Sequence, residues 1–211
     1  MTQRGNRRER VFFSDVDFEL YRDLLREACA RETVAVWSYC LMPNHVHLIL
    51  TPATPEGLGR ALGKAHRRYS AFVNARNRVT GHLFQARFSS AVMDEEHLIA
   101  AARYVAMNPV RARLVERAED WPWSSARAHL AGRDDGLVEV APLLGRCGGR
   151  FADLIADEPA VALVAGLRAA ETVGRPLGGP PFLDRLAVLS GRDPRPKKRG
   201  RKPRLVADAA G

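Results

Sequence analysis

The sequence predicts an α+β fold: a ferredoxin-like antiparallel sheet with flanking helices, followed by a small helical C-terminal extension and a basic tail. Two runs rich in β-branched and aromatic residues, 34–41 and 45–51, are separated by the turn-forming Met42-Pro43-Asn44, which predicts a hairpin. Helical patterns flank it in the order strand, helix, strand, strand, helix, strand, helix, as in a split βαβ arrangement. With 211 residues, 46% of them apolar, the chain can bury one good core.

Capping residues and apolar spacing define the elements around this hairpin. The first strand is expected to be short, because only residues 1–4 are available for it. Residues 14–32 are expected to form a helix that Ser14 caps, with an apolar stripe of Phe18, Tyr21, Leu24, Leu25 and Ala28. A second helix opens at residues 54–56, because Pro55 is tolerated in a first turn. It directs Leu58, Leu62, Tyr69, Phe72 and Val73 towards the core and carries Arg60, Lys64, Arg67 and Arg68 on its polar side.

A third helix follows a basic loop at residues 76–81 and an alternating, strand-like segment at residues 88–93. Asp94 is expected to cap this helix, and Asn108 to end it, since Pro109 disfavours helical geometry in the residue before it. Trp121 and Trp123 could stack on bases, but we favour core packing for both. A serine after them can cap a short helix through residue 130.

The C-terminal part differs in composition from residue 150 onward. We expect an Ala/Val/Leu-rich helix near residues 159–173 and a last helix near residues 181–189. Residues 192–204 hold eight Lys or Arg in thirteen positions, interleaved with proline and glycine, and are expected to be disordered when free. The predicted units are residues 1–131, a helical extension at 132–190 and the basic tail at 191–211.

Charge and cysteine content narrow the class of protein. The formal net charge is +9 and the pI is about 10.2, which favours a polyanion such as nucleic acid as partner. The three cysteines have no CxxC spacing, which argues against a disulfide framework and a thiolate zinc site. No apolar run is long enough to span a membrane, and the N-terminus does not read as a signal peptide. We expect a cytoplasmic, nucleoid-associated protein that is a monomer or a homodimer.

Two histidines open the second hairpin strand with one residue between them. Successive strand side chains point to opposite faces, so His45 and His47 share one face and can hold a divalent metal ion together. The alternative is a pair of hydrogen-bonded, partly exposed strand histidines. On the third helix, Tyr104 and Asn108 lie one turn apart and could add a nucleophile and an amide ligand. The alternative there is a half-buried tyrosine and a C-terminal helix cap.

Residues 39–48, Tyr39-Cys40-Leu41-Met42-Pro43-Asn44-His45-Val46-His47-Leu48, resemble the HUH motif of single-tyrosine transposases, in which U is a bulky apolar residue. Further segments resemble the branch called REP-associated tyrosine transposases: Thr2-Gln3-Arg4-Gly5-Asn6, Phe84-Gln85-Ala86-Arg87-Phe88, Tyr104-Val105-Ala106-Met107-Asn108-Pro109-Val110-Arg111-Ala112 and Trp123-Ser124-Ser125. These motifs follow the family's order over roughly residues 1 to 130. One departure is Arg113, which stands where glycine is usual and is expected to alter the turn after the third helix.

The resemblance implies roles for the site residues and a reaction. His45, His47 and Asn108 would bind the metal, and Tyr104 would attack a phosphodiester of hairpin-forming single-stranded DNA, leaving a 5′-phosphotyrosine. Ligand type favours Mn²⁺, Co²⁺ or Zn²⁺, whereas the resemblance points to Mg²⁺ or Mn²⁺. Tyr69 is a rival nucleophile, but it lacks an amide at the next turn.

Basic residues spread along the chain are candidate DNA contacts. They are Arg4, Arg67, Arg68, Arg76, Arg78 and Arg87, with Lys197, Lys198, Arg199, Arg201 and Lys202 in the tail. The tail weakly resembles the Arg-Gly-Arg core of minor-groove AT-hook peptides. Two other functions remain open: a catalytically silent DNA-binding protein, and a small metal phosphodiesterase that activates water.

Overall fold

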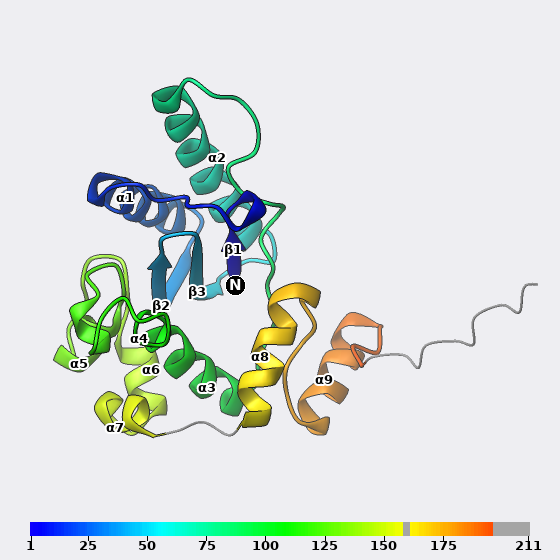
Figure 1. Ribbon diagram of the computed structural model, residues 1–211. Coiled ribbons are helices and arrows are strands. Elements are labelled where there is room, and N and C mark those ends of the chain that lie inside the picture. Colours follow the sequence, from blue (N-terminus) through cyan, green and yellow to red (C-terminus); the bar gives the residue numbers. More distant parts are fainter. Residues whose placement is uncertain (158–160, 196–211) are drawn as a thin grey trace, which may run out of the picture.

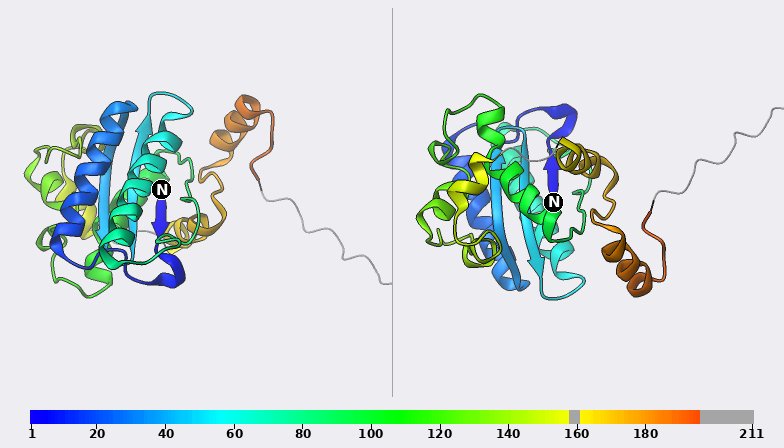
Figure 2. Two further views of the ribbon diagram at one scale, coloured as in Figure 1. Left: turned by 90° about the horizontal axis from the view of Figure 1, so that it is seen from above. Right: turned by 90° about the horizontal axis from the view of Figure 1, so that it is seen from below.

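The computed structural model describes residues 1–157 and 161–195 of the chain. Its centre is an antiparallel sheet of three strands in the order β1 (Thr2–Arg4), β3 (His45–Pro52), β2 (Val34–Met42). Helices α1 (Asp15–Arg31) and α2 (Gly57–Asn77) cover one face, and α3 (Glu95–Ala106) lies on the other (Figures 1 and 2). The sheet is therefore buried between two helical layers, and a residue's position along each strand determines which layer it meets.

Shorter helices and a C-terminal pair complete the described part of the chain. They are η1 (Asn6–Arg8), α4 (Asn108–Arg111), η2 (Ala118–Asp120), α5 (Ala126–Ala131), α6 (Ala141–Arg146), α7 (Phe151–Ala156), α8 (Val161–Val173) and α9 (Pro180–Ser190). Helix α8 packs beside α3. No described helix is both long and apolar enough to cross a membrane.

Helix α1 forms where its capping residues predict. The backbone N–H of Ser14 donates to the carboxylate of Asp17 at 3.1 Å, so the first turn is closed by a capping box. The apolar stripe of α1 packs against α2 and the sheet, with Tyr21 and Leu25 fully buried. Helix α2 buries Leu62, Tyr69 and Val73 in the same core, as expected.

Two expectations for α2 were wrong. Phe72 is 38% exposed, because it lies at the edge of the apolar stripe, where the Arg76 guanidinium carbon lies 5.4 Å from the ring centroid. The predicted loop at residues 76–81 begins two residues later, since α2 continues through Asn77 and ends with Arg78 in a left-handed conformation at φ 53°. The ion pair between Arg76 and Asp17 of α1 supports this last helical turn.

Helix α3 begins at the predicted cap but ends earlier than expected. Asp94 Oδ1 accepts a hydrogen bond from the backbone N–H of His97 at 3.0 Å. The helix stops at Ala106, and Asn108 begins α4 rather than ending α3. Pro109 explains the break, because it has no N–H to continue the α3 hydrogen-bond ladder and suits a first helical turn.

Residues 88–93 do not form the predicted fourth strand. Only an isolated bridge joins Ser89 to Thr2, although the extended segment after α2 runs beside β1 (Figure 2). Strand β1 is three residues long and offers few backbone partners. At the other end of the segment, the backbone of Leu177 replaces β1 as the hydrogen-bond partner. The Leu177 N–H donates to the carbonyl of Val92 at 2.9 Å, and the Leu177 carbonyl accepts from the N–H of Asp94 at 3.0 Å.

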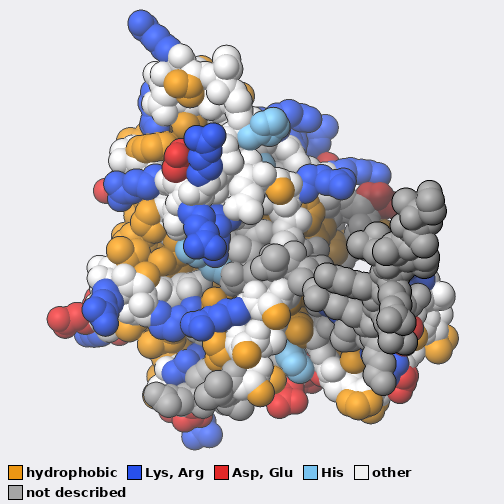
Figure 3. Space-filling view, turned by 45° about the vertical axis from the view of Figure 1, so that its right-hand side comes forward, with side chains coloured by type: hydrophobic (Ala, Val, Ile, Leu, Met, Phe, Trp, Pro, Cys, Tyr) orange, Lys and Arg blue, Asp and Glu red, His pale blue; other side chains and the backbone are white. Residues whose placement is uncertain are grey.

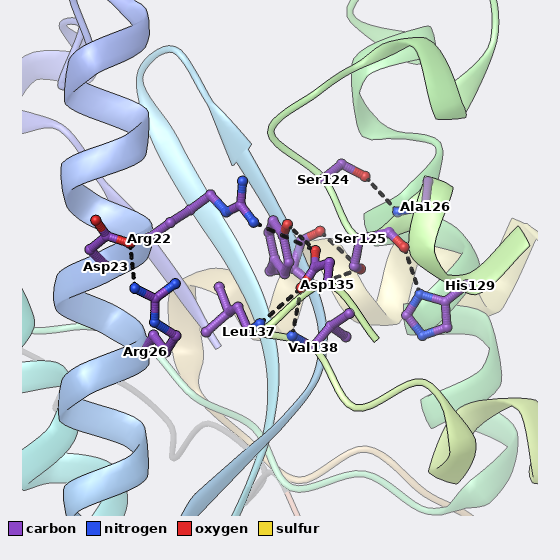
Figure 4. Close-up of polar contacts among 11 residues, drawn as sticks. Arg22, Asp23, Arg26, Ser124, Ser125, Ala126, His129, Asp135, Leu137 and Val138 are labelled. Carbon is purple, nitrogen blue, oxygen red and sulfur yellow. Dashed lines mark hydrogen bonds and ion pairs between the residues drawn. The ribbon is translucent and has the colours of Figure 1, made fainter. Parts of the chain in front are cut away.

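The outer edge of β2 is closed by two segments from later in the chain; Figure 4 labels Ser124 and Ser125 in one of them and Leu137 and Val138 in the other. The backbone of Leu41 donates to Trp123 at 2.8 Å, and Glu139 donates to Val36 at 2.8 Å. Covering the edge satisfies its backbone groups. Trp123 is 8% exposed and stacks on Phe18 at 4.9 Å, so it packs in the core as favoured.

The C-terminal expectations have mixed outcomes. Helices α8 and α9 lie within two residues of their predicted bounds. Leu137, Val138 and Val140 of the predicted extension pack in the same core as α1 and α2. The unit boundaries at 131 and 190 stay predictions, and residues 196–211, which hold most of the basic tail, lie outside the described residues.

Candidate active site

His45 and His47 lie side by side on the face of the sheet that α3 covers. Strand register pairs His45 with Met42 and His47 with Cys40, so all four side chains point to this face. The two imidazole centroids are 4.7 Å apart with their planes 83° from each other. His47 is 4% exposed, whereas His45 is half-buried at the strand's beginning.

Both imidazoles are held in the neutral form. Burial, and secondarily the charge of Arg4, lowers the pKa of His45 to about 4. Burial and then the neighbouring His45 lower the pKa of His47 well below its ordinary value. His45 Nδ1 lies 2.6 Å from Asn44 Oδ1, an oxygen that only accepts, so Nδ1 carries the proton and Nε2 keeps the lone pair. His47 Nδ1 lies 3.1 Å from the Thr2 hydroxyl.

Helix α3 brings Tyr104 to the histidine pair. The centroid of its ring lies 5.8 Å from that of His47, with the planes at 85°. Small residues on α3, Ala100, Ala101 and Ala102, are buried and let the helix approach the sheet closely. Tyr104 is 9% exposed. The structure therefore brings together the two motifs that the sequence places about sixty residues apart.

Asn108 and Arg111 of α4 complete this cluster. Asn108 is 7% exposed, and its Oδ1 accepts a hydrogen bond from Arg111 Nη2 at 2.6 Å. The guanidinium carbon of Arg111 lies 3.8 Å from the centroid of the Tyr104 ring. One side chain thus contacts both the candidate nucleophile and the candidate ligand.

Sequence reasoning missed Arg111, although a signal was available. Positions 108 and 111 are three residues apart, and residue 111 is seven residues, or two turns, from Tyr104. That spacing predicts a shared helical face only if the helix continues past residue 107. The break at Pro109 argued against such continuity, but α4 begins at Asn108, two residues after the end of α3.

The donor set fits a divalent metal ion of intermediate softness. Two neutral imidazoles offer nitrogen lone pairs, and the Asn108 carbonyl retains a second lone pair beside its bond to Arg111. Asn108 Nδ2 is buried and has no hydrogen-bond partner in the described part of the chain. No group of three His, Cys, Asp or Glu side chains there could hold a metal ion, so the amide is the candidate third donor.

The predicted DNA-contacting arginines fall into two groups. Arg4 lies opposite His45 in the strand register, on the histidine face, and Arg67, Arg78 and Arg87 are exposed. Arg68 instead pairs with Glu27, and Arg76 pairs with the buried carboxylate of Asp17. Figure 3 shows Lys and Arg side chains spread over the upper half of the molecule, with few Asp or Glu among them. The tail residues Lys197, Lys198, Arg199, Arg201 and Lys202 lie outside the described residues.

Tyr69, the rival nucleophile, has a structural role. Its hydroxyl donates to the carbonyl of Val11 at 2.6 Å, and its side chain is fully buried among Phe12, Tyr21 and Phe84. No DNA phosphate can reach a hydroxyl enclosed in this core without unfolding it.

Comparisons with known proteins find similar sequences and a similar fold. A family model described as "Transposase IS200 like" matches residues 2–108, which include both histidines, Tyr104 and Asn108. A curated protein of Haemophilus influenzae, described as "Putative REP-associated tyrosine transposase", is 27% identical over 121 residues. That match covers 50% of this chain and 66% of the relative's length. A solved structure described as a REP-associated tyrosine transposase bound to a REP hairpin has a similar fold, with a TM-score of 0.53 and 18% identity over 65% of this chain and 79% of that one.

Proposed function

The chain belongs to the IS200-like transposase family, and from this membership we propose that it nicks and rejoins hairpin-forming single-stranded DNA in a metal-dependent reaction. The observation that carries the proposal is the 5.8 Å distance between the ring centroids of Tyr104 and His47, with Asn108 at the start of α4, which follows α3 directly. The structural relative is described as bound to a REP hairpin, which supports a hairpin as substrate class. We also propose that the three-stranded antiparallel sheet and its helices form a ferredoxin-like fold.

The proposed chemistry is a phosphoryl transfer to tyrosine. Tyr104 Oη forms a bond to phosphorus as the bond from phosphorus to the 3′ oxygen breaks; the phenol proton leaves, and the 3′ oxygen gains a proton. The product is a 5′-phosphotyrosine and a free 3′-OH. A later attack by another 3′-OH on this ester reverses the step and joins strands without ATP. Burial of Tyr104 supports this reversibility, because excluding water protects the ester from hydrolysis.

Ionising the phenol is the main energetic obstacle. A tyrosine with an ordinary pKa near 10 needs about 4 kcal/mol to ionise at pH 7. Positive charge near Oη offsets this cost, and the guanidinium of Arg111 lies directly over the ring. When bound by His45, His47 and Asn108, Mg²⁺ or Mn²⁺ would act as a Lewis acid and stabilise charge on the phosphate.

The test is adduct formation with a labelled hairpin oligonucleotide and Mn²⁺. Wild type should form a covalent protein–DNA species, and Tyr104→Phe should form none while melting at a similar temperature. Tyr69→Phe serves as the control: it should still form the adduct, although losing the bond to Val11 lowers its stability. Cleavage by Tyr104→Phe would refute the assignment of the nucleophile. Hairpin binding with no cleavage by wild type would favour a catalytically silent DNA-binding protein.

A further inference from the structure

Each of the two candidate metal-binding histidines has a polar contact at Nδ1. His45 Nδ1 lies 2.6 Å from Asn44 Oδ1, and His47 Nδ1 lies 3.1 Å from the hydroxyl of Thr2 in β1. In a neutral imidazole one ring nitrogen carries the proton, and the other keeps the lone pair that can bind a metal ion. The group that contacts Nδ1 therefore decides whether Nε2 is available as a metal ligand.

A second contact of Asn44 fixes the direction in which its amide faces. Asn44 Nδ2 donates to the backbone carbonyl of Arg8 at 3.1 Å. Because a carbonyl only accepts, the NH₂ end of the amide has to face Arg8 and the oxygen has to face His45. The amide oxygen only accepts as well, so His45 Nδ1 is the nitrogen that carries the proton. The lone pair of His45 is left on Nε2.

The carbonyl that holds the Asn44 amide belongs to a firmly held turn. Arg7 and Arg8 both have left-handed backbone conformations, at φ 51° and 63°, which are costly for residues other than glycine. The N–H of Gly5 donates to the backbone carbonyl of Asn44 at 2.8 Å. A Cβ at Gly5 would lie 2.2 Å from the carbonyl of Glu9, so the turn is also closely packed. Such strain persists only where the surrounding structure holds it, which makes the turn a fixed support for the amide.

Strand pairing places Thr2 against His47. β1 and β3 are antiparallel, and Thr2 lies directly opposite His47 in their register. Side chains of directly opposite residues point to the same face of the sheet, so the hydroxyl meets the edge of the ring. The backbones of Thr2 and Ser89 exchange hydrogen bonds of 2.8 and 2.9 Å, which hold β1 from its other side. A hydroxyl can accept as well as donate, so Thr2 can accept the Nδ1 proton while His47 binds a metal ion through Nε2.

We propose that Asn44 and Thr2 are positioning residues of the metal site: each accepts the Nδ1 proton of one histidine, so that both Nε2 lone pairs can bind the same ion. The proposal deepens the proposed function and rests on it for the identity of the metal ligands. Removing such an outer partner of a metal-binding histidine typically costs about 10- to 100-fold in metal affinity or activity. Asn44 contributes more than Thr2, because two contacts fix its amide whereas a hydroxyl can rotate.

The first measurement reports the ring tautomers without any metal. Long-range ¹H–¹⁵N correlation spectra of the full-length protein at neutral pH distinguish a protonated ring nitrogen from one that keeps its lone pair. Wild type should show His45 with its proton on Nδ1, and Asn44→Ala should show a mixture of the two tautomers. His129 is an internal reference: its Nδ1 lies 2.8 Å from the carbonyl of Ser125, so its tautomer should be the same in both proteins.

The second measurement is Mn²⁺ affinity, followed by electron paramagnetic resonance of the unbound ion. Asn44→Ala should weaken binding by about 10- to 100-fold. Asn44→Asp keeps an acceptor facing His45 and should bind at least as tightly as wild type. Asn74→Ala is the matched control, because it removes a similar amide bond, 2.9 Å to the carbonyl of Gly81, near the end of α2. It should bind like wild type.

Thr2 is tested in the same assay. Thr2→Val removes the hydroxyl but keeps the shape of the side chain, and it should weaken Mn²⁺ binding by about 10-fold, the lower end of the range. Thr2→Ser keeps the hydroxyl and should restore binding close to wild type. Wild-type affinity in Thr2→Val would overturn the role of Thr2.

Three results would overturn the role of Asn44. They are a wild-type His45 with its proton on Nε2, an unchanged tautomer and affinity in Asn44→Ala, or a loss of affinity in Asn44→Ala without a change of tautomer. The last result would show that Asn44 only supports the turn. The first uses wild type alone, so it holds even if a variant folds poorly.

Two further results separate this proposal from the proposed function. Unchanged Mn²⁺ binding by His45→Ala would refute the ligand assignment on which both depend. Binding that requires His45 but is unaffected by Asn44→Ala and Thr2→Val would refute the positioning roles alone. Binding that depends on Asn44 and Thr2, in a wild-type protein that forms no DNA adduct, would refute only the enzymatic activity.

Discussion

Removing the guanidinium of Arg111 tests whether one side chain holds both Tyr104 and Asn108 in place. Two of its contacts are a 3.8 Å approach to the ring centroid and a 2.6 Å hydrogen bond to the amide oxygen. A cation–π contact at an exposed site contributes about 0.5–1 kcal/mol, and a hydrogen bond from a charged group about 1.5–3 kcal/mol. Arg111 is exposed, so we expect Arg111→Met to lower the free energy of unfolding by about 2 kcal/mol, the low end of the sum.

This loss of stability corresponds to a fall in melting temperature of about 4–8 °C. The larger effect is expected on chemistry, because displacing reacting atoms by about 1 Å can cost roughly 10²-fold in rate. Single-turnover adduct formation at saturating hairpin DNA should therefore fall by up to roughly 10²-fold. The dissociation constant for DNA should change little, since Arg111 is one of 33 Lys and Arg residues.

Two further variants separate position from charge. Arg111→Lys keeps the charge but loses the planar group that stacks on Tyr104, so the rate should stay low if orientation is what Arg111 provides. Arg113→Lys changes an exposed neighbour in the same turn and should leave rate and melting temperature unchanged. A wild-type rate in Arg111→Met would refute the reasoning.

Other predictions concern backbone strain, a buried ion pair and protonation. Arg113 has φ 57°, so Arg113→Gly should raise the free energy of unfolding by about 0.5–1 kcal/mol. Ala112 has φ −82°, which suits any residue, so Ala112→Gly should lower the free energy of unfolding. Calorimetry should show a higher melting temperature for the first variant and a lower one for the second. Burial raises the pKa of Asp17, but the bond from Arg76 and two backbone N–H groups outweigh it, so the folded pKa lies below the unfolded 3.8. Arg76→Gln should cost about 2 kcal/mol at pH 7 in urea unfolding, and the difference from wild type should shrink as pH falls below 3.8. Because the pKa of His45 is about 4, Mn²⁺ binding followed by electron paramagnetic resonance should hold steady from pH 7 to 5.5; a midpoint near 6.5 would contradict this.

Several parts of the site could be predicted because they depend on local geometry alone. The strand period of two places His45 and His47 on one face whatever the sheet packs against. Asp94 caps α3 through the backbone N–H of His97, three residues along the chain. The spacing of residues 104 and 108 does not follow from one helix period, because α3 ends at Ala106 and Asn108 begins α4. Arg113 adopts a left-handed conformation, at φ 57°, which usually favours glycine. The expectation that it alters the turn stays a prediction.

The sequence by itself determined which side chains could form a site with a metal ion and a nucleophile. Strand periodicity and helix capping decide this, because both act within a few positions of the chain. Only the tertiary structure decided which of them have partners. Arg76 of α2 forms an ion pair with Asp17 of α1, which lies 59 positions earlier in the sequence. Residues 88–93 form hydrogen bonds with Leu177 instead of adding a fourth strand to the sheet. Arg8 and Arg87 line one groove beside Thr2 because residues 85–89, distant in the sequence, bond to β1. Such pairings depend on distances through space, which no spacing along the sequence encodes.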